Sequence, residues 1–476
     1  MSNEEPLYNG VDARTGAYLP AWSDREVLRE LRVAPMDPAA YRTYLWWVEQ
    51  FGIDDPFRQP VHRVDPKSLA SAGWCVIFAP DVSADVRKAL SPLLRHRSEQ
   101  AGTLYQEFTY EIGQTKEQFL QAKRADNGPA DPRFVPYYVL LVGDPRTLPF
   151  QFQYDLDVQY AVGRLYFEKV EDYGNYAAGV LAAEKDNSVR PPRRIAFFGT
   201  SNKGDRPTER TLTDLVRPLA EALRDQYRHW PQARVFGEEA IKRNLGPLVG
   251  GPERAALLMA ATHGMRFPAG DPLQMRDQGA LLCQEWERPA EGEEKAIPPE
   301  QYFSSVDVSA EADLRGMIAF LFACYSAGTP EVSDFDAESG VPHIDTPSSL
   351  APRTFLSGLA KSLLAHPKGG CLAVLGHVDR AFTLSFSWSG RSQPQVFESV
   401  LGRLLDGYPI GAATEFINQR HAELAVSTNR DLLGWQEAGY LSASGMADLA
   451  RRVKAGHDAR NFVVLGDPAV RLTWRE

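Results

Sequence analysis

The stretch Met317–Gly328, MIAFLFACYSAG, decides the fold together with a second stretch, Leu257–Gly264, LLMAATHG. Each is an apolar run of strand length that stops at a chemically reactive side chain, Cys324 in the first and His263 in the second. Open α/β sheets build their sites where the carboxyl ends of parallel strands lie side by side. The sequence therefore predicts that this thiol and this imidazole meet, which supplies the pair needed for covalent acyl transfer.

Strand-like and helix-like segments alternate on both sides of these two stretches. Such alternation predicts an α/β fold with a mostly parallel sheet flanked by helices. The expected strands are 73–79, 137–142, 157–166, 194–198, 255–262, 316–323, 371–375 and 462–465, and the expected helices are 38–51, 83–100, 208–228, 354–365, 395–406 and 410–426.

Composition suggests how the chain divides. Residues 1–70 are rich in Pro, Trp and charge, and the polar segment 184–193 contains a Pro pair and suits a domain boundary. We therefore expect an N-terminal extension over 1–70, an α/β subdomain over 71–190 and a second α/β domain over 191–476. A Gly-Asp-Pro turn follows a strand in both α/β parts, which hints at internal duplication.

Bulk properties exclude several functional classes. The chain has 476 residues, 43% of them hydrophobic and 24% charged, as is usual for a globular protein. Its net charge of -10 and the absence of a basic stripe disfavour nucleic-acid binding. Residues 1–6 do not resemble a signal peptide, and no run of 18 apolar residues occurs, so we expect a cytoplasmic protein without a membrane partner. The four cysteines form no CxxC pair, so no zinc site or disulfide framework is expected.

Each candidate catalytic residue also has a structural interpretation. A lone buried cysteine is usually a small hydrophobic residue, and we assign Cys75 and Cys371 to that role. Cys324 differs because a matching strand ends in His263, so we favour Cys324 as nucleophile and His263 as general base and acid. Gly264 leaves room for a substrate carbonyl, and the backbone N–H groups of Gly264 and Cys324 would form an oxyanion hole.

A strand ending in His-Gly and a strand ending in Ala-Cys resemble the caspase-like cysteine peptidases of clan CD. This clan includes caspases, gingipains and bacterial CHAT-domain proteases, and the resemblance covers about residues 193–476. The segment 137–166 is similar to the gingipain pattern of a strand, Gly-Asp, a Pro and then Asp…Tyr…Gly-Arg. The resemblance implies a caspase-like three-layer sandwich, preceded by a degenerate caspase-like subdomain, with His263 and Cys324 catalytic. The caspase pentapeptide Gln-Ala-Cys-x-Gly is absent, which puts Asp-specific cleavage in doubt.

The function implied by this resemblance is an intracellular cysteine endopeptidase that cleaves a protein after a selected P1 residue. It requires no cofactor and allows a structural Ca2+ ion. An activator or regulatory partner is expected, because a cytosolic protease must be restrained, and bacterial relatives act in defence and cell-death systems. Two alternatives stay open: a catalytically silent scaffold with a caspase-like fold, and a different acyl transferase or hydrolase that uses the same pair.

The primary specificity (S1) pocket would be built by three loops near the catalytic pair. The carboxylates of Asp205 and Asp379 would bind a basic P1 side chain through charge-assisted hydrogen bonds. Arg206 and Arg380 would instead accept an acidic P1 residue, but the gingipain-like character favours a basic one. Trp388 would form a wall of the pocket. The alternative is that these charges are solvated surface. The three loops are residues 199–206, 321–323 and 376–380.

Two long segments without periodic pattern, 283–305 and 329–352, lie on either side of Cys324 in the sequence. Loops of this length inside a compact domain are usually functional or disordered, and their positions favour function. The first is acidic and contains Arg288 and Lys295, either of which is a candidate site of self-cleavage. His377 ends a further apolar run, and a structural role is favoured for it.

Overall fold

The computed structural model describes residues 7, 9–18, 60–61, 63–125, 127–290, 293–335, 349–388, 391–438 and 443–475. The helix expected at 38–51 and most of the loop 329–352 lie outside the described residues.

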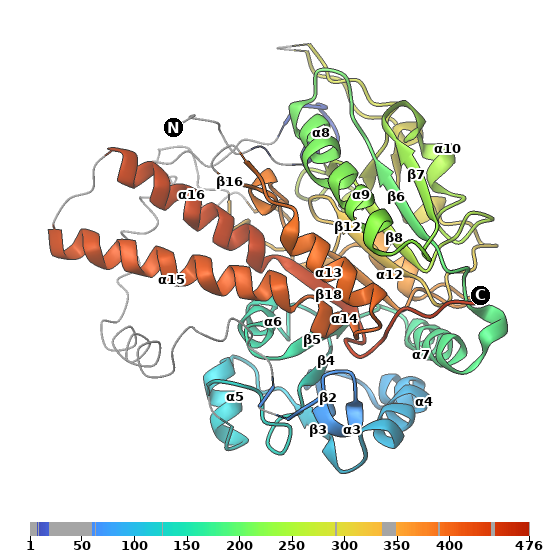
Figure 1. The fold of residues 1–476 in the computed structure, drawn as a ribbon, viewed down its shortest axis with the longest axis vertical. Coiled ribbons are helices and arrows are strands. Elements are labelled where there is room, and N and C mark those ends of the chain that lie inside the picture. The colour runs from blue at the N-terminus through green and yellow to red at the C-terminus, as the bar shows by residue number, and fades with distance from the viewer. Residues whose placement is uncertain are drawn as a thin grey trace.

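A single ten-stranded sheet runs through the molecule (Figure 1), in the order β3-β2-β4-β5-β18-β15-β12-β8-β6-β7. Eight of its nine neighbouring pairs are parallel, so the predicted α/β class with a mostly parallel sheet is confirmed. The strands are β2 (Trp74–Phe78), β3 (Tyr105–Thr109), β4 (Tyr138–Val142), β5 (Ala161–Leu165), β6 (Ile195–Gly199), β7 (Gln232–Phe236), β8 (Leu257–Ala261), β12 (Ile318–Phe322), β15 (Ala373–His377) and β18 (Phe462–Gly466).

Strand β18 joins the two halves of this sheet. It runs parallel to β5, the last strand of the first half, and antiparallel to β15 of the second half. The predicted boundary at 184–193 falls between β5 and β6, where the chain crosses from one half to the other. The halves share one continuous sheet, and their division into a degenerate and a catalytic subdomain stays a prediction.

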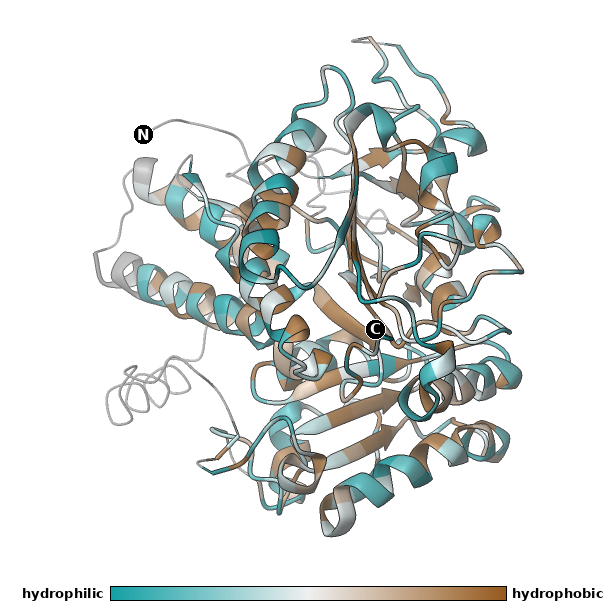
Figure 2. Cartoon of the chain, turned by 45° about the vertical axis from the view of Figure 1, so that its right-hand side comes forward, coloured by the Kyte–Doolittle hydropathy of each residue, from teal (hydrophilic) through white to brown (hydrophobic). Residues whose placement is uncertain are grey.

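Helices cover the sheet. Figure 2 shows that the strands of the sheet are the most hydrophobic part of the molecule. Helices α4 and α7 pack together on the first half, and α15 packs against α13 and α16 on the second. The longer helices are α4 (Ala84–Ala101), α5 (Lys116–Ala122), α6 (Phe150–Asp157), α7 (Val170–Lys185), α9 (Arg217–Gln226), α12 (Gly358–Leu364), α13 (Gln395–Leu405), α15 (Glu415–Ala438) and α16 (Ala443–Arg460); the short ones are α3 (Leu69–Ala72), α8 (Arg206–Arg210), α10 (Lys242–Leu245), α11 (Gln274–Asp277) and α14 (Ile410–Ala413).

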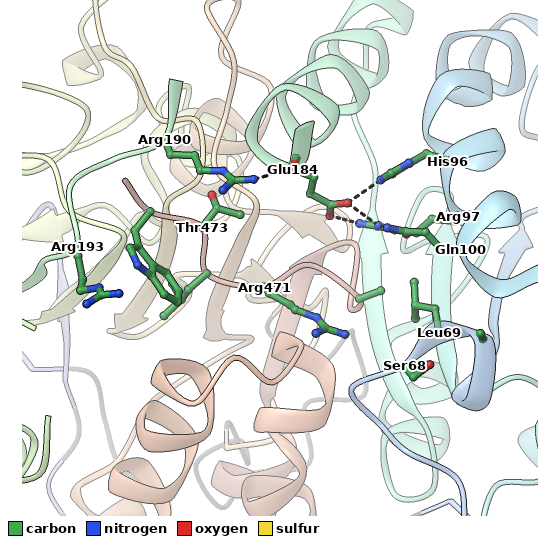
Figure 3. Close-up of a pocket in the computed structure, with 14 residues that line it drawn as sticks. Ser68, Leu69, His96, Arg97, Gln100, Glu184, Arg190, Arg193, Arg471 and Thr473 are labelled. Carbon is green, nitrogen blue, oxygen red and sulfur yellow. Dashed lines mark hydrogen bonds and ion pairs between the residues drawn. The ribbon is translucent and has the colours of Figure 1, made fainter. Parts of the chain in front are cut away.

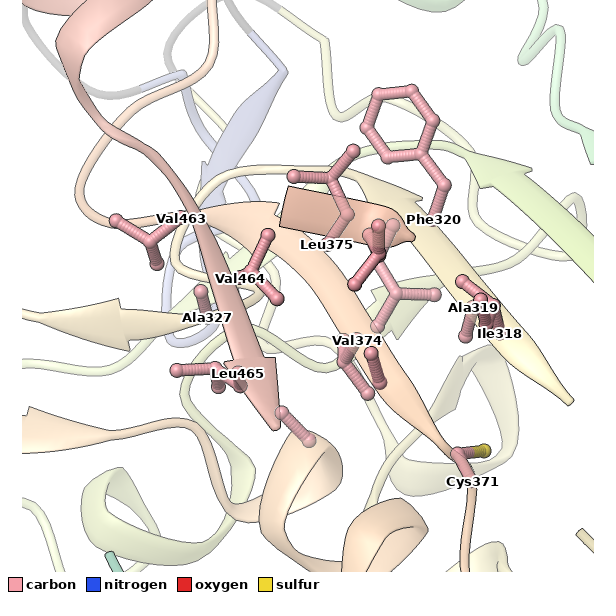
Figure 4. Packing of buried hydrophobic residues seen from close by; sticks show 14 of the residues in the cluster. Ile318, Ala319, Phe320, Ala327, Cys371, Val374, Leu375, Val463, Val464 and Leu465 are labelled. Atoms are coloured by element: carbon pink, nitrogen blue, oxygen red, sulfur yellow. The ribbon is translucent and has the colours of Figure 1, made fainter. Parts of the chain in front are cut away.

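The core is continuous through the middle of the sheet, where β12, β15 and β18 lie side by side (Figure 4). Ile318, Val374 and Val464 are all fully or almost fully buried there. Strands covered on both faces have no polar side to show, which is why these segments read as unbroken apolar runs. Cys371, just before β15, is part of this core.

A second, four-stranded sheet lies at the end of β8, in the order β1-β9-β10-β11. Its outer strand, β1 (Gly10–Asp12), comes from the N-terminal region and pairs in parallel with β9 (Gly264–Arg266), directly after His263. Strands β10 (Leu281–Leu282) and β11 (Tyr302–Phe303) complete it. The N-terminal segment therefore reaches the edge of the main sheet where the two apolar runs end.

Candidate active site

His263 and Cys324 follow two strands that are direct neighbours. Strands β8 and β12 are parallel over their whole length, and the N–H of Thr262 donates to the carbonyl of Phe322 at 3.2 Å. A Cβ atom placed on Gly264 would lie 1.9 Å from the carbonyl oxygen of Cys324. Only glycine fits where the two backbones come this close, so the structure brings His263 and Cys324 to one point.

The imidazole of His263 is held by the carboxylate of Asp205. Its Nε2 atom lies 3.0 and 2.9 Å from the two carboxylate oxygens, and both side chains are fully buried. Because a carboxylate accepts, Nε2 carries the proton. The Nδ1 atom has no hydrogen-bond partner among the described residues, so it is the nitrogen left to exchange a proton with a reacting group.

Asp205 is the N-cap of α8 and also accepts from the backbone N–H of Thr208 at 3.1 Å and from the hydroxyl of Tyr18. Burial alone would raise its pKa, but the charge of His263 and the hydrogen bonds from His263, Thr208 and Tyr18 lower the pKa to about 2. We predicted that Asp205 lines the S1 pocket. The structure places it behind the imidazole instead, because His263, Thr208 and Tyr18 take its hydrogen bonds.

The thiol of Cys324 is fully buried, and its sulfur accepts the backbone N–H of Ala381 at 3.2 Å. Burial raises the pKa of this thiol, while the Ala381 hydrogen bond and the charge of Arg380 act in the opposite direction. The next residue, Tyr325, has a φ of 60°, in the left-handed region, so the chain turns sharply after the cysteine. This turn presents the sulfur at the end of the sheet.

Two backbone donors converge beside this sulfur. The N–H groups of Gly264 and Cys324 both donate to the carbonyl oxygen of Asn9, at 2.8 and 3.3 Å. Paired donors aimed at one carbonyl oxygen are the arrangement that the predicted oxyanion hole requires. In this structure the carbonyl that accepts from them belongs to the N-terminal segment.

The loop after β15 forms one wall of the site. Ala381 accepts the N–H of Asn9 at 2.9 Å, and the N–H of Thr383 donates to the carbonyl of Leu7 at 2.7 Å. This loop therefore binds an extended segment through its backbone, while its Ala381 N–H contacts the thiol of Cys324.

A buried carboxylate on α16, Asp458, holds this loop in place. It accepts the backbone N–H of Phe382 at 2.9 Å and the hydroxyl of Ser385, and it lies 3.3 Å from Nε2 of His377. The structural role favoured for His377 agrees with this position, since its Nε2 also contacts the Asp458 carbonyl. Sequence reasoning missed Asp458, because nothing in the α16 pattern marks it.

Asp379 and Trp388, the other residues predicted for the S1 pocket, each have contacts of their own. The buried carboxylate of Asp379 accepts from the hydroxyl of Ser333 at 2.7 Å and from the N–H of Asp334 at 2.8 Å. Trp388 lies on β16 (Ser387–Trp388) and lines a separate pocket with Arg420. The roles of Asp379 and Trp388 in S1 stay predictions.

Figure 3 shows a pocket of about 740 Å³ that is separate from this site. It lies between α4, α7 and the segment after β18, and Arg97 bridges Glu184 and Asp467 beside it. It shares no lining residue with the site around His263 and Cys324.

Within the described ranges, no cluster of three or more His, Cys, Asp or Glu side chains is arranged to hold a metal ion. The structural Ca2+ ion therefore has no assigned ligands and stays a prediction. No helix in the described part of the chain combines the length and apolarity that crossing a membrane requires.

The sequence profile of peptidase family C25 matches residues 83–473, most of the chain. This chain belongs to peptidase family C25. The match confirms the resemblance to caspase-like cysteine peptidases of the gingipain type, and this C25 member is a cysteine endopeptidase. No protein with a curated description matches it in sequence.

Solved structures similar to this C25 peptidase include two of a gingipain. One is the complex of the Porphyromonas gingivalis RgpB pro- and mature domains, with 14% identity, coverage of 84% of this chain and 80% of that chain, and a TM-score of 0.48. Another is the Arg-specific cysteine proteinase gingipain R (RGPB), with 14% identity, coverage of 88% and 80%, and a TM-score of 0.48. A third, described as a protease, has 12% identity, coverage of 85% and 80%, and a TM-score of 0.47.

Proposed function

We propose that this C25 endopeptidase hydrolyses a protein substrate through Cys324, with His263 as general base and acid and Asp205 as the residue that positions His263. One observation carries the proposal: the backbone N–H groups of Gly264 and Cys324 both donate to one peptide carbonyl. The same two chain segments supply the thiol of Cys324 and the Nδ1 atom of His263, which has no hydrogen-bond partner among the described residues. These are the components that acyl transfer through a thioester requires.

The reaction follows from this arrangement. The sulfur of Cys324 bonds to the carbonyl carbon of the substrate, and its proton passes to Nδ1 of His263. The negative oxygen that forms is stabilised by the N–H groups of Gly264 and Cys324. His263 then protonates the leaving amine as the C–N bond breaks. Water attacks the thioester, the C–S bond breaks, and the proton returns to sulfur through His263.

A basic P1 residue remains part of the proposal. It rests on the gingipain-like character of the sequence and on one acidic side chain, Asp379, whose backbone lies near the site: its carbonyl accepts the N–H of Tyr325. Asp205 cannot serve both His263 and a P1 side chain with the same oxygens. A cytoplasmic location, a regulatory partner and a role in bacterial defence are further proposals that rest on the resemblance alone.

The test is cleavage of a P1-diverse fluorogenic peptide library by wild type, Cys324→Ala and Cys371→Ala. Cys371 is a matched control, because it is an equally buried cysteine outside the site. We expect wild type and Cys371→Ala to cleave and Cys324→Ala to be inactive. Equal cleavage by all three proteins would overturn the proposal, and a biological function that survives Cys324→Ala would favour the scaffold alternative.

A further inference from the structure

The N-terminal segment crosses the active site in the orientation of a substrate. On one side of the sulfur, Leu7 pairs with Thr383, whose N–H donates to the Leu7 carbonyl at 2.7 Å and whose hydroxyl accepts the Leu7 N–H at 3.2 Å. At the sulfur, the Asn9 carbonyl fills the oxyanion hole and the Asn9 N–H binds Ala381. A residue whose carbonyl occupies the oxyanion hole occupies the P1 position.

On the other side of the sulfur the same segment continues as strand β1. Gly10 lies opposite Gly264 and Asp12 opposite Arg266 in the parallel pairing with β9. Val11 is fully buried in a small apolar cluster with Met265 and Leu282. The peptide bond between Asn9 and Gly10 therefore lies at the position of a scissile bond, with paired backbone on both sides.

The Asn9 side chain shows what the S1 pocket accepts. It is fully buried, and its Nδ2 donates to the hydroxyl of Thr211 at 3.0 Å. That hydroxyl has a close acceptor in the carbonyl of Pro207 at 2.8 Å and a more distant one in Asn9 Oδ1 at 3.4 Å, so the shorter contacts have it donating to Pro207 and accepting from Asn9. An aspartate at this position could not donate and would face the oxygen of Thr211 with a carboxylate instead.

We propose that the Asn9–Gly10 bond is a cleavage site of this enzyme within its own chain, and that Thr211 makes the S1 pocket accept an asparagine side chain. This rests on the proposed function, since it uses the same sulfur and the same oxyanion hole. It adds a neutral carboxamide to the P1 residues of the enzyme, and it places self-cleavage at a site other than Arg288 or Lys295.

The step balances without any reagent other than water. The Cys324 sulfur bonds to the Asn9 carbonyl carbon, the Asn9–Gly10 C–N bond breaks, and Gly10 nitrogen takes the proton that His263 received from the thiol. Water then releases a fragment that ends in an Asn9 carboxylate and restores the thiol. Pairing with β9 and the apolar cluster around Val11 hold the new N-terminus at Gly10 in place. Departure of the fragment uncovers the wall formed by Ala381 and Thr383.

The test follows intact mass and N-terminal sequence of the purified chain over time. Wild type should lose residues 1–9 and begin at Gly10, whereas Cys324→Ala should stay whole. Cys324→Ala also controls for non-enzymatic cleavage of the Asn9–Gly10 bond. Replacement of an exposed asparagine, Asn187→Ala, should leave the cleavage rate unchanged.

Two further variants test the role of Thr211. Thr211→Val removes the hydroxyl that accepts from Asn9 and should slow the loss of residues 1–9 by about 10-fold. Thr211→Ser keeps a hydroxyl and should restore the rate of wild type. On peptides, Thr211→Val should lower kcat/KM for P1 Asn more than for P1 Arg. A misfolded variant would lower both equally, so this difference separates recognition from folding.

The outcomes separate this inference from the proposed function. Library peptides cleaved through Cys324 while residues 1–9 stay attached would overturn self-cleavage and leave the endopeptidase intact. Loss of residues 1–9 at the same rate from Cys324→Ala would also overturn it, because the enzyme would not be responsible. A chain that cleaves neither peptides nor itself would overturn both proposals.

Discussion

The Nε2 atom of His263 lies 2.9 Å from the carboxylate of Asp205, and both side chains are fully buried. We predict that Asp205→Asn lowers kcat by at least about 100-fold, because the imidazole loses the acceptor that fixes its tautomer and orientation. KM should change little, since Asp205 does not touch the substrate. Steady-state kinetics on one peptide checks this, with Asp205→Glu expected to recover part of kcat. A raised KM at unchanged kcat would contradict the positioning role.

The same carboxylate should make stability depend on pH at the acidic end. Its pKa is about 2 in the folded chain against an ordinary value of 3.8, so the folded state favours the ionised form. The stabilisation is full above about pH 4 and is lost as the pH falls toward 2, with a total of about 2 kcal/mol. Urea unfolding of Cys324→Ala with and without Asp205→Asn should show a constant difference from pH 7 to 5 that narrows below about pH 4. A difference that already narrows between pH 7 and 5 would refute this assignment.

Gly264 tests how closely the two catalytic strands must approach. In Gly264→Ala the new Cβ would lie 1.9 Å from the Cys324 carbonyl oxygen and 2.7 Å from its nitrogen, so backbone has to move. We expect the oxyanion hole to be misplaced, kcat to fall about 100-fold and the free energy of unfolding to fall by about 1–3 kcal/mol. Gly174→Ala is the control: it lies on α7 with no atom within 4 Å of its Cβ position, and it should be neutral or slightly stabilising.

The position of His263 and Cys324 at the ends of neighbouring strands could be predicted because its signal is local. β8 and β12 are fully buried strands between two layers of helices, so each reads as an apolar run with an abrupt end. The edge strands β3 and β7 were not predicted, because their half-exposed sequences, YQEFT and QARVF, mix polar and apolar residues. The strand expected at 157–166 was only partly right, since α6 extends to Asp157 and β5 begins at Ala161.

The surroundings of the pair could not be predicted, because they depend on contacts between distant segments. Asp205 looks like any other N-cap in the sequence, and only the packing of α8 against the end of β8 brings it to His263. The pairing of Gly10 with Gly264 joins residues far apart in the chain, and no repeat or motif in the sequence predicts it. The family resemblance supplied the fold and the chemistry but assigned this N-terminal region no place.

The loop that binds the N-terminal segment should depend on Asp458. In Asp458→Ala the N–H of Phe382 loses its acceptor, so Ala381 and Thr383 are no longer held in register with a substrate. We expect KM for peptides to rise about 10-fold, with a smaller change in kcat. Asp458→Asn, which keeps an oxygen for Phe382, should lie between this variant and wild type. An unchanged KM in both variants would show that the loop after β15 keeps its conformation without Asp458.

Arg97 should contribute strongly to stability where the two halves of the sheet meet. It is almost fully buried and lies 2.6 Å from both Asp467 and Glu184. Arg97→Leu should lower the free energy of unfolding by about 3–5 kcal/mol, because it leaves buried carboxylates without a countercharge. Arg133→Leu removes an arginine from an exposed pair with Asp131 and should change little in urea unfolding. An equal loss of unfolding free energy in Arg97→Leu and Arg133→Leu would mean that the buried ion pairs stabilise the fold no more than the exposed one.

The place of β18 between β5 and β15 has a consequence for the order of events during synthesis. The chain leaves the ribosome from its N-terminal end at about 5–20 residues per second, so His263 and Cys324 emerge well before β18 does. Until residues 462–466 follow, β18 is missing from its place between β5 and β15, and the two halves of the ten-stranded sheet stay unjoined. We therefore expect the nascent chain to be inactive during synthesis and to gain peptidase activity only when β18 has inserted into the sheet.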